Sequence, residues 1–302
     1  MHYIKNQIDF TQSDLLIHAH SMTNDGLLAY KLYKKYKLPY VLTVRNTDVN
    51  FTLKYKKHLF KIYEKVLVNA EVIIFPNHSY KNKMIEIFKS NEKLIFKMKN
   101  SRIIPNGVDR FWHENYSEQY RKLNLKKEIN VLFVGRIYKQ KNLHRVVSAI
   151  NQLNEQKYNV NYNVVGSVID KKYFEKLNKS KDFNYLGEKS KIEILDIMKD
   201  NDMFIMPSEN ETFGLVYIEA ISQNLPIIFT KNEGIDDYFP ENKYGEAVNA
   251  FEVNSIKNGI LKIIKDYEKY QKNMISKNHL EDFKWEKIGF TYSLLYKGIL
   301  EK

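Results

Sequence analysis

Short apolar runs of strand length alternate with longer segments whose apolar residues recur at helical spacing, through most of the 302 residues. This alternation is typical of parallel sheets covered by helices. Four strands are expected before residue 110, at 14–20, 39–46, 71–77 and 102–107. Five are expected after it, at 130–136, 161–167, 183–187, 203–208 and 226–230. We therefore predict an α/β protein with two doubly wound, Rossmann-like parallel sheets rather than one sheet of nine strands.

The join between the two sheets is expected within residues 105–128, which begin with a Pro-Asn-Gly turn signal and then become polar. This predicts an N-terminal domain over 1–110 and a C-terminal domain over 111–283. Residues 283–299 have the pattern of an amphipathic helix, and no expected strand follows them. In parallel sheets ligands bind at the carboxyl ends of strands, and a cleft between the two domains is the expected place for a site.

The chain has no cysteine, which excludes a disulfide framework and any cysteine-based metal site or nucleophile. No run reaches the roughly 18 to 20 apolar residues that span a bilayer, and residues 1–12 lack the apolar core of a signal peptide. A cytoplasmic location is therefore expected.

Charge is distributed unevenly along the chain. Residues 1–110 hold 19 Lys and Arg against 9 Asp and Glu, a net of +10, and the remainder hold 29 against 27. A basic half favours an anionic partner, and we expect association with the inner face of the cell membrane. The alternative is compositional drift, because lysine is abundant throughout. We expect no nucleic acid as a partner, because no recognition motif accompanies the charge.

The segment VGRIYKQKN, residues 134–142, is the first candidate site. Gly135 ends an expected strand and permits close approach of a ligand to the backbone. Arg136 and Lys141 follow in the turn before the next helix. Two cations at a strand end suit a phosphate or diphosphate, and the alternative is a solvated basic loop.

The segment PSENETFGLVYIE, residues 207–219, is the second candidate. Gly214 lies where a helix begins, so the backbone N–H groups from Thr212 to Leu215 are available to an anion. The Glu211 carboxylate, in the loop, suits sugar hydroxyls. The Glu219 carboxylate, about two turns along, suits the two hydroxyls of a ribose. The alternative is that Glu211 caps the helix and Glu219 is solvated.

These motifs follow one another in a family order: FVGR with a lysine five residues on, then LG, then the segment holding Glu211 and Glu219, then PII-x-T-x3-G. The order resembles the donor domain of family-four retaining glycosyltransferases of the GT-B fold. The resemblance covers roughly residues 14–300. It includes IIPNGVD at 103–109, where similar chains pass between domains, and a last helix at 284–302 that packs back on the N-terminal domain.

The resemblance implies transfer of a hexose from a nucleoside diphosphate sugar, UDP- or GDP-linked, to a glycan or lipid-linked acceptor. Similar enzymes retain the anomeric configuration, bind no metal or other cofactor, and many build surface polysaccharides such as capsule. Arg136 and Lys141 would hold the diphosphate, and Glu211 the sugar hydroxyls. The remaining donor-binding residues would be Gly135, Leu186, Gly187, Thr212, Phe213, Gly214, Leu215 and Glu219.

The N-terminal half departs from the family pattern, because it is shortened and lacks a glycine-rich loop. His20, Arg45 and Asp48 resemble acceptor-side residues, with Arg45 suited to an acceptor phosphate and Asp48 to a hydroxyl. His18 is expected on the opposite strand face from His20, so the two should not share a metal ion.

Two further departures leave alternatives open. Glu233 replaces a glycine in the loop 230–237, and it is expected to point away from the diphosphate or toward sugar hydroxyls. The shortened first domain allows a catalytically inactive protein that binds a nucleotide or stabilises a partner glycosyltransferase. A GT-B sugar-nucleotide epimerase is a further alternative.

Overall fold

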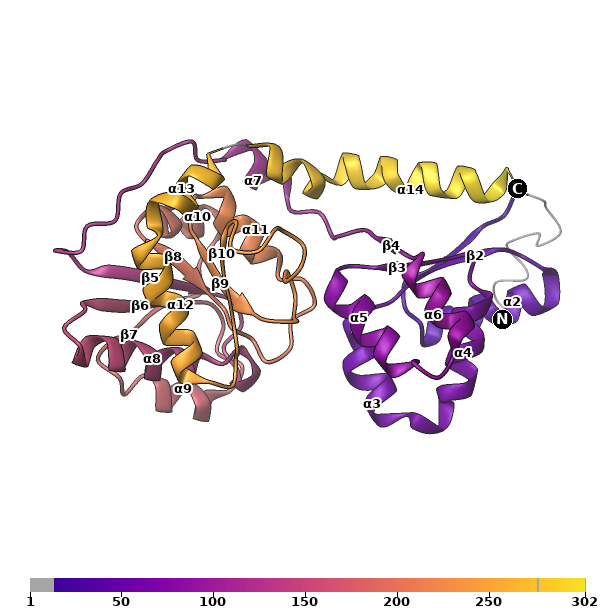
Figure 1. The fold of residues 1–302 in the computed structure, drawn as a ribbon, viewed down its shortest axis with the longest axis horizontal. Coiled ribbons are helices and arrows are strands. Elements are labelled where there is room, and N and C mark those ends of the chain that lie inside the picture. The colour runs from indigo at the N-terminus through magenta and orange to yellow at the C-terminus, as the bar shows by residue number, and fades with distance from the viewer. Residues whose placement is uncertain (1–13, 276, 302) are drawn as a thin grey trace. The chain divides into compact units, whose positions relative to one another are not determined.

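The computed structural model describes residues 14–275 and 277–301 (Figure 1). The chain divides into two compact units. The N-terminal unit consists of the chain up to Asn106 together with the C-terminal segment from Trp285 onward. The C-terminal unit is Gly107–Lys284. Within the described residues no helix combines the length and apolar character that crossing a membrane requires.

The N-terminal unit contains a four-stranded parallel sheet in the order β1-β2-β3-β4. Its strands are β1 (Ile17–Ala19), β2 (Tyr40–Thr43), β3 (Val72–Phe75) and β4 (Arg102–Ile103). Its helical elements are α2 (Asn24–Tyr36), η1 (Thr47–Thr52), α3 (Leu53–Tyr55), η2 (Lys57–Leu59), α4 (Phe60–Asn69), α5 (His78–Ile87), α6 (Glu92–Lys99) and α14 (Trp285–Leu300).

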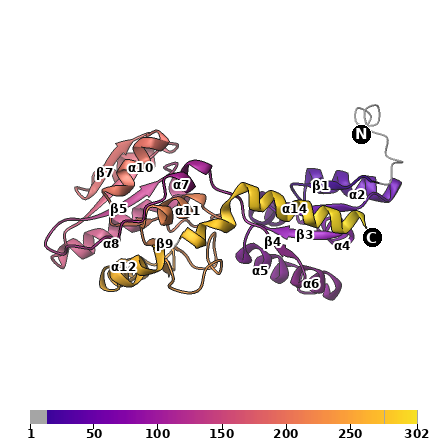
Figure 2. The same cartoon turned by 90° about the horizontal axis from the view of Figure 1, so that it is seen from above.

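Both faces of this sheet are buried, because successive side chains of a strand alternate between them. Tyr40 and Leu42 of β2 pack into the larger core beneath the helices that connect the strands. Val41 lies on the other face, where it contacts a smaller core that includes Ile288 and Ile299 of α14. Figures 1 and 2 show α14 running along this second face. The last helix therefore completes the unit.

The C-terminal unit contains a six-stranded parallel sheet in the order β10-β9-β8-β5-β6-β7. Its strands are β5 (Ile129–Val134), β6 (Val160–Val165), β7 (Phe183–Gly187), β8 (Met203–Ile205), β9 (Ile227–Thr230) and β10 (Gly245–Val248). Its helical elements are α7 (Arg110–Glu114), η3 (Lys139–Lys141), α8 (Leu143–Glu155), α9 (Lys171–Leu177), α10 (Lys191–Lys199), α11 (Leu215–Ser222), α12 (Val253–Lys265), α13 (Tyr267–Met274) and η4 (Lys277–Phe283).

Strand order reverses beside β5. The chain builds β6 and β7 on one side of β5 and then returns to place β8 on the other side. The sheet is therefore doubly wound, and its topological switch point lies between β5 and β8.

The structure differs from the sequence expectation at β10 and at residues 53–70, among other elements. Strand β10 was not expected, because its Gly and Glu have low strand propensity. A Cβ at Gly245 would lie 1.8 Å from the Ile227 carbonyl oxygen, so the glycine is what lets β10 approach β9. The apolar residues of 53–70 recur at helical spacing, which predicts one helix there. The structure interrupts it at Lys56, whose backbone leaves helical geometry at φ −111° and ψ 49°.

Candidate active site

The switch point of the C-terminal sheet carries the two segments singled out in the sequence. Residues 135–141 leave the carboxyl end of β5, and residues 206–211 leave the carboxyl end of β8. These strands are hydrogen-bonded neighbours, so the two segments begin side by side. In open α/β sheets this is where ligands bind.

The backbones of β5 and β6 approach each other closely where the two strands end, next to the switch point. Gly135 follows β5 and Gly166 follows β6, and Gly135 donates its N–H to the Val165 carbonyl at 2.9 Å. A Cβ on Gly166, whose φ is +135°, would lie 2.0 Å from the Gly135 carbonyl oxygen. Only glycine fits there. The sequence candidates included Gly135 and omitted Gly166, although the repeated Val-Gly strand ending was the signal available.

Lys141 and Glu211 form an ion pair at the switch point. The Lys141 Nζ lies 2.7 Å from Glu211 Oε2, and each side chain is only 14% exposed. The other carboxylate oxygen of Glu211 accepts the N–H of Thr212 at 2.9 Å. The sequence assigned these residues to two different parts of a donor, and the structure brings their charges together. A diphosphate would compete for the lysine and free the carboxylate for hydroxyl groups.

The loop after β9 supports Glu211 through backbone contacts. Gly234 donates its N–H to the Glu211 carbonyl at 3.0 Å. Glu233 Oε2 accepts the backbone N–H of Glu211 at 3.3 Å. A contact between Glu233 and a sugar hydroxyl stays a prediction, and the observed contact gives this carboxylate a role in holding the loop.

The start of α11 is shaped by Gly214, which takes a left-handed conformation at φ +76°. The Phe213 ring before it is buried, with ring centres 5.4 Å from Tyr238 and 5.6 Å from Phe283. Thr212 and Leu215 remain partly exposed. The Phe213 side chain therefore anchors the loop in the core. Only the backbone of Phe213 is placed to contact a ligand.

Glu219 lies on α11 in a site that disfavours its charge. Burial raises the pKa of this carboxyl to about 7, while the charge of Lys191 and a hydrogen bond from the Trp112 side chain act in the opposite direction. Lys191 is itself paired with Asp109. Trp112 and Lys191 were not among the sequence candidates, because they come from α7 and α10, far from Glu219 in the chain.

The remaining donor-side candidates lie at other strand ends of this sheet. Arg136 comes two residues after β5, is exposed, and has no hydrogen bond or ion pair to another described residue. Leu186 and Gly187 end β7, which is separated from β8 by two strands, β5 and β6. Gly187 has φ +82°, and no atom lies within 4 Å of the position of a Cβ.

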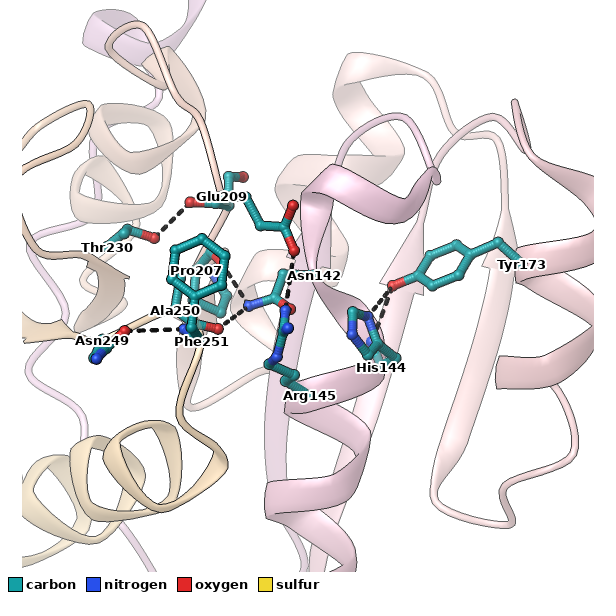
Figure 3. A network of polar contacts seen from close by, with 11 residues as sticks. Asn142, His144, Arg145, Tyr173, Pro207, Glu209, Thr230, Asn249, Ala250 and Phe251 are labelled. Carbon is teal, nitrogen blue, oxygen red and sulfur yellow. Dashed lines mark hydrogen bonds and ion pairs between the residues drawn. The ribbon is translucent and has the colours of Figure 1, made fainter.

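A polar network ties the two site segments together (Figure 3). Asn142, fully buried at φ +64°, donates from Nδ2 to the Pro207 carbonyl at 3.0 Å and to the Ala250 carbonyl at 2.6 Å. Arg145 donates from Nη1 to Asn142 Oδ1 at 2.7 Å and to Glu209 Oε1 at 3.0 Å. The network fixes the segment before Glu211 against the start of α8.

The same figure shows a second contact at the start of α8. The Tyr173 hydroxyl lies 3.0 Å from both the backbone nitrogen and Nδ1 of His144. Burial and the neighbouring Arg145 lower the pKa of His144. His144 therefore helps to fix the start of α8 through its contacts with Tyr173.

Replacing Asn142 with alanine is expected to lower the free energy of unfolding by about 2 kcal/mol, because two buried carbonyls lose their donor. Urea denaturation measures the change. Asn142→Gly is the matched comparison, since glycine accepts the left-handed backbone and removes the same hydrogen bonds. It should lose a similar amount. Wild-type stability in the glycine variant would show that the hydrogen bonds do not support the segment.

The acceptor-side candidates of the N-terminal unit lie at the ends of β1 and β2. His20 is exposed just beyond β1. The Arg45 guanidinium donates from Nε to the His20 carbonyl at 3.1 Å and lies 3.4 Å from both His20 Nδ1 and Asn106 Oδ1. These contacts hold Arg45 beside His20. The groups that they join to the guanidinium carry no negative charge.

Asp48 differs from expectation. It is fully buried, and its carboxylate accepts backbone N–H groups of Met22 at 2.9 Å, Thr23 at 3.3 Å and Arg45 at 2.8 Å. Burial raises the pKa of Asp48, and these donors oppose the shift. In this conformation its oxygens join the β1 and β2 ends and do not face an acceptor hydroxyl.

The expectation that His18 and His20 lie on opposite strand faces is wrong. Residues two apart in a strand share a face, and the two rings lie 4.0 Å apart. The ring nitrogens of His18 bond to the Tyr296 hydroxyl at 2.6 Å and the Thr43 hydroxyl at 2.8 Å. Burial, then the charges of His20 and Arg45, lower the pKa of His18 to about 4. His18 therefore connects α14 to the sheet as a neutral ring.

Two family profiles match the chain. The profile described as Glycosyl transferases group 1 matches residues 115–279, more than half of the chain, and the profile described as Glycosyltransferase Family 4 matches residues 1–110. The chain belongs to the family-four glycosyltransferases. The paired parallel sheets, the switch point in the second sheet and the profile matches agree with one another.

Curated relatives and solved structures extend this assignment. The glycosyltransferase is 29% identical over 252 residues to an uncharacterized 41.2 kDa protein in the cps region of Klebsiella pneumoniae, covering 80% of this chain and 67% of that one. It is 27% identical over 261 residues to alpha-monoglucosyldiacylglycerol synthase of Acholeplasma laidlawii, covering 78% of this chain and 64% of that one. The chain thus spans about two thirds of the length of these relatives.

The fold of the glycosyltransferase matches that of Anabaena HepE, solved in complex with UDP. The TM-score is 0.73 at 16% identity, and the match covers 94% of this chain and 78% of HepE. The glycosyltransferase therefore has the GT-B fold that was expected from the sequence.

Proposed function

We propose that this glycosyltransferase transfers a hexosyl group from a nucleoside diphosphate sugar to a glycan or lipid-linked acceptor with retention of configuration. The observation that carries the proposal is the Lys141–Glu211 ion pair, which is largely buried at the switch point of the C-terminal sheet. Its lysine suits a diphosphate and its carboxylate suits sugar hydroxyls.

The chemistry proposed for the site is electrostatic. The bond between the anomeric carbon and the diphosphate oxygen breaks, and negative charge develops on that oxygen. The oxygen of the acceptor hydroxyl bonds to the anomeric carbon on the same face, and the hydroxyl proton passes to the departing diphosphate. Arg136 and Lys141 would stabilise this charge, and Glu211 would hold the sugar in place. We propose that the reaction needs no metal ion or other cofactor. Added EDTA should leave the rate unchanged, and loss of activity restored by a divalent cation would contradict this part.

The relatives supply the substrate classes. One is encoded in a cps region, one is named for the synthesis of a glucosyl lipid, and HepE was solved with UDP. These names support a UDP-linked donor, a lipid-linked or glycan acceptor, and a role in surface polysaccharide such as capsule. A GDP-linked donor is the alternative. We propose that the protein works at the cytoplasmic face of the membrane as a peripheral protein.

A transfer assay tests the proposal. The purified chain is incubated with radiolabelled UDP- or GDP-hexose and with lipid extracted from bacterial membranes, and labelled glycolipid is then separated and its anomeric configuration read by NMR. The account predicts a labelled product with the configuration of the donor. Inverted configuration contradicts retention. Nucleotide binding without transfer, with activity appearing only beside a co-purified glycosyltransferase, favours the alternative of an inactive partner.

Donor affinity is expected to rise with pH. A ribose diol donates to the ionised form of Glu219, and with a pKa of about 7 the ionised fraction grows about tenfold between about pH 6 and about pH 8. Calorimetry with the nucleotide sugar that binds should show an affinity gain of that size. Glu219→Gln should bind more weakly and with no such gain. An equal pH dependence in the variant would contradict this role.

The same shift predicts the pH dependence of stability. The folded pKa lies above the unfolded value, so the unfolded chain loses this proton first as pH rises. Stability therefore falls between about pH 4.5 and about pH 7 through this group. Glu219→Gln should lack that fall, measured by urea denaturation across the same range.

A further inference from the structure

An exposed pair of aromatic rings marks a surface that the proposed transfer reaction does not use. Phe51 lies in the last turn of η1 and Tyr55 ends α3, and the two residues are 57% and 64% exposed in the N-terminal unit. Their ring centres lie 5.3 Å apart. Neighbouring exposed aromatic side chains are costly in water unless something covers them.

Exposed lysines lie close to these rings in the chain. Lys54, Lys56, Lys57 and Lys61 are exposed, as is His58. We name the seven side chains the basic aromatic surface: Phe51, Lys54, Tyr55, Lys56, Lys57, His58 and Lys61. The Lys54 ammonium lies 5.5 Å from the centre of the Tyr55 ring.

Acidic groups are absent from this stretch of chain. No Asp or Glu occurs between residues 49 and 63. Asp48 before it is fully buried on backbone N–H groups, and Glu64 after it accepts the Asn91 side-chain amide. Among the described residues no carboxylate pairs with the four lysines. The surface therefore carries positive charge that the protein itself does not neutralise.

The backbone holds these side chains outward. Thr52 and Leu53 are buried and anchor the segment to the core. The α-helical geometry of α3 ends at Lys56, and the 3-10 helix η2 follows it over Lys57–Leu59. Figure 1 shows α3 at the end of this unit that lies across the sheet from α14. The exposure is thus a result of the local fold.

We propose that the basic aromatic surface docks on anionic phospholipid headgroups. Aromatic rings with a polar or cationic neighbour are suited to the membrane interface, and clustered lysines bind an anionic leaflet. Charge complementarity selects this partner, and the proposal rests on the proposed function through the lipid-linked acceptor. η1 begins two residues after Arg45, so the docking segment continues directly from the acceptor-side strand end.

Vesicle co-sedimentation of the full chain tests this. One vesicle set contains equal parts of phosphatidylglycerol and phosphatidylcholine, and the other contains phosphatidylcholine alone, each at about 50 mM and about 300 mM salt. Wild type should bind the anionic vesicles only, and more weakly at high salt. Lys54→Ala/Lys56→Ala/Lys57→Ala should lower the affinity on the order of a hundredfold. Phe51→Ser/Tyr55→Ser should lower it about tenfold.

A matched control comes from the C-terminal unit. Lys171, Lys172 and Lys176 on α9 are equally exposed, and their triple alanine variant should bind vesicles as wild type does. Circular dichroism checks that every variant is folded. The proposal is overturned if the control loses as much affinity, if the first triple variant binds normally, or if the protein ignores vesicles and binds single-stranded RNA through these residues.

The outcome is separable from that of the proposed function. Calorimetric titration with nucleotide reports on the C-terminal unit, and the lysine and aromatic variants should bind nucleotide as wild type does. Nucleotide binding without vesicle binding would reject the docking surface alone. Vesicle binding without nucleotide binding would reject the donor site alone.

Discussion

Lys141→Ala is expected to lower kcat/KM for hexosyl transfer by about two to three orders of magnitude, the usual effect of removing one preorganised group that stabilises developing charge. The lysine is only 14% exposed and contacts Glu211 at 2.7 Å, so it is both oriented and partly desolvated. Its loss also leaves the Glu211 carboxylate without its cation, which would repel an incoming diphosphate.

Glu211→Ala should lower transfer by a similar factor, and the double variant should lose less than the two single losses combined, because each group positions the other. Lys199→Ala is the control: Lys199 forms an exposed ion pair with Asp196 on the same unit, and its removal should leave activity unchanged. Transfer from labelled donor measures all four proteins. Near wild-type activity in Lys141→Ala would reject the assigned role.

Gly166→Ala is expected to lower the free energy of unfolding by about 3 kcal/mol or more. The new methyl group would meet the Gly135 carbonyl oxygen at 2.0 Å and its carbonyl carbon at 2.7 Å, at a backbone φ of +135°. The two strand ends would have to separate. Nucleotide affinity should fall at least about tenfold, because separating the strand ends would displace Gly135 and the cations that follow it.

Gly187→Ala is the matched comparison at the end of β7. Its φ is also positive, at +82°, yet open space surrounds the new methyl group. Only backbone strain remains, so the expected loss is about 1 kcal/mol. Urea denaturation compares the two variants. Equal losses would show that close backbone approach at Gly166 contributes nothing beyond its backbone angles.

The sequence correctly placed several candidate residues after the ends of parallel strands. Gly135, Lys141 and Glu211 follow apolar runs, and parallel strands bring their carboxyl ends to one edge of a sheet. Nothing local indicated that Lys141 and Glu211 are paired, since 70 residues separate them. The same holds for Glu219, whose pKa depends on burial and on Trp112 and Lys191 from other elements.

The fold was harder to predict where local propensity and packing disagree. β10 exists because Gly245 lets it approach β9. The helix expected at 53–70 is interrupted at Lys56, between α3 and η2. Asp48 is an acidic residue of the kind usually found in exposed loops. It is buried here because its carboxylate accepts three backbone N–H groups. These outcomes depend on contacts between segments that are distant in the chain.

Calorimetric titration with UDP, GDP and ADP tests the central claim most directly, that the C-terminal unit binds a nucleoside diphosphate at its switch point. Wild type is compared with Arg136→Ala, which removes the exposed cation, and with Glu219→Ala. The account predicts saturable binding of one nucleotide, weakened by about tenfold or more in both variants. Failure of all three nucleotides to bind, or equal binding by both variants, would contradict it.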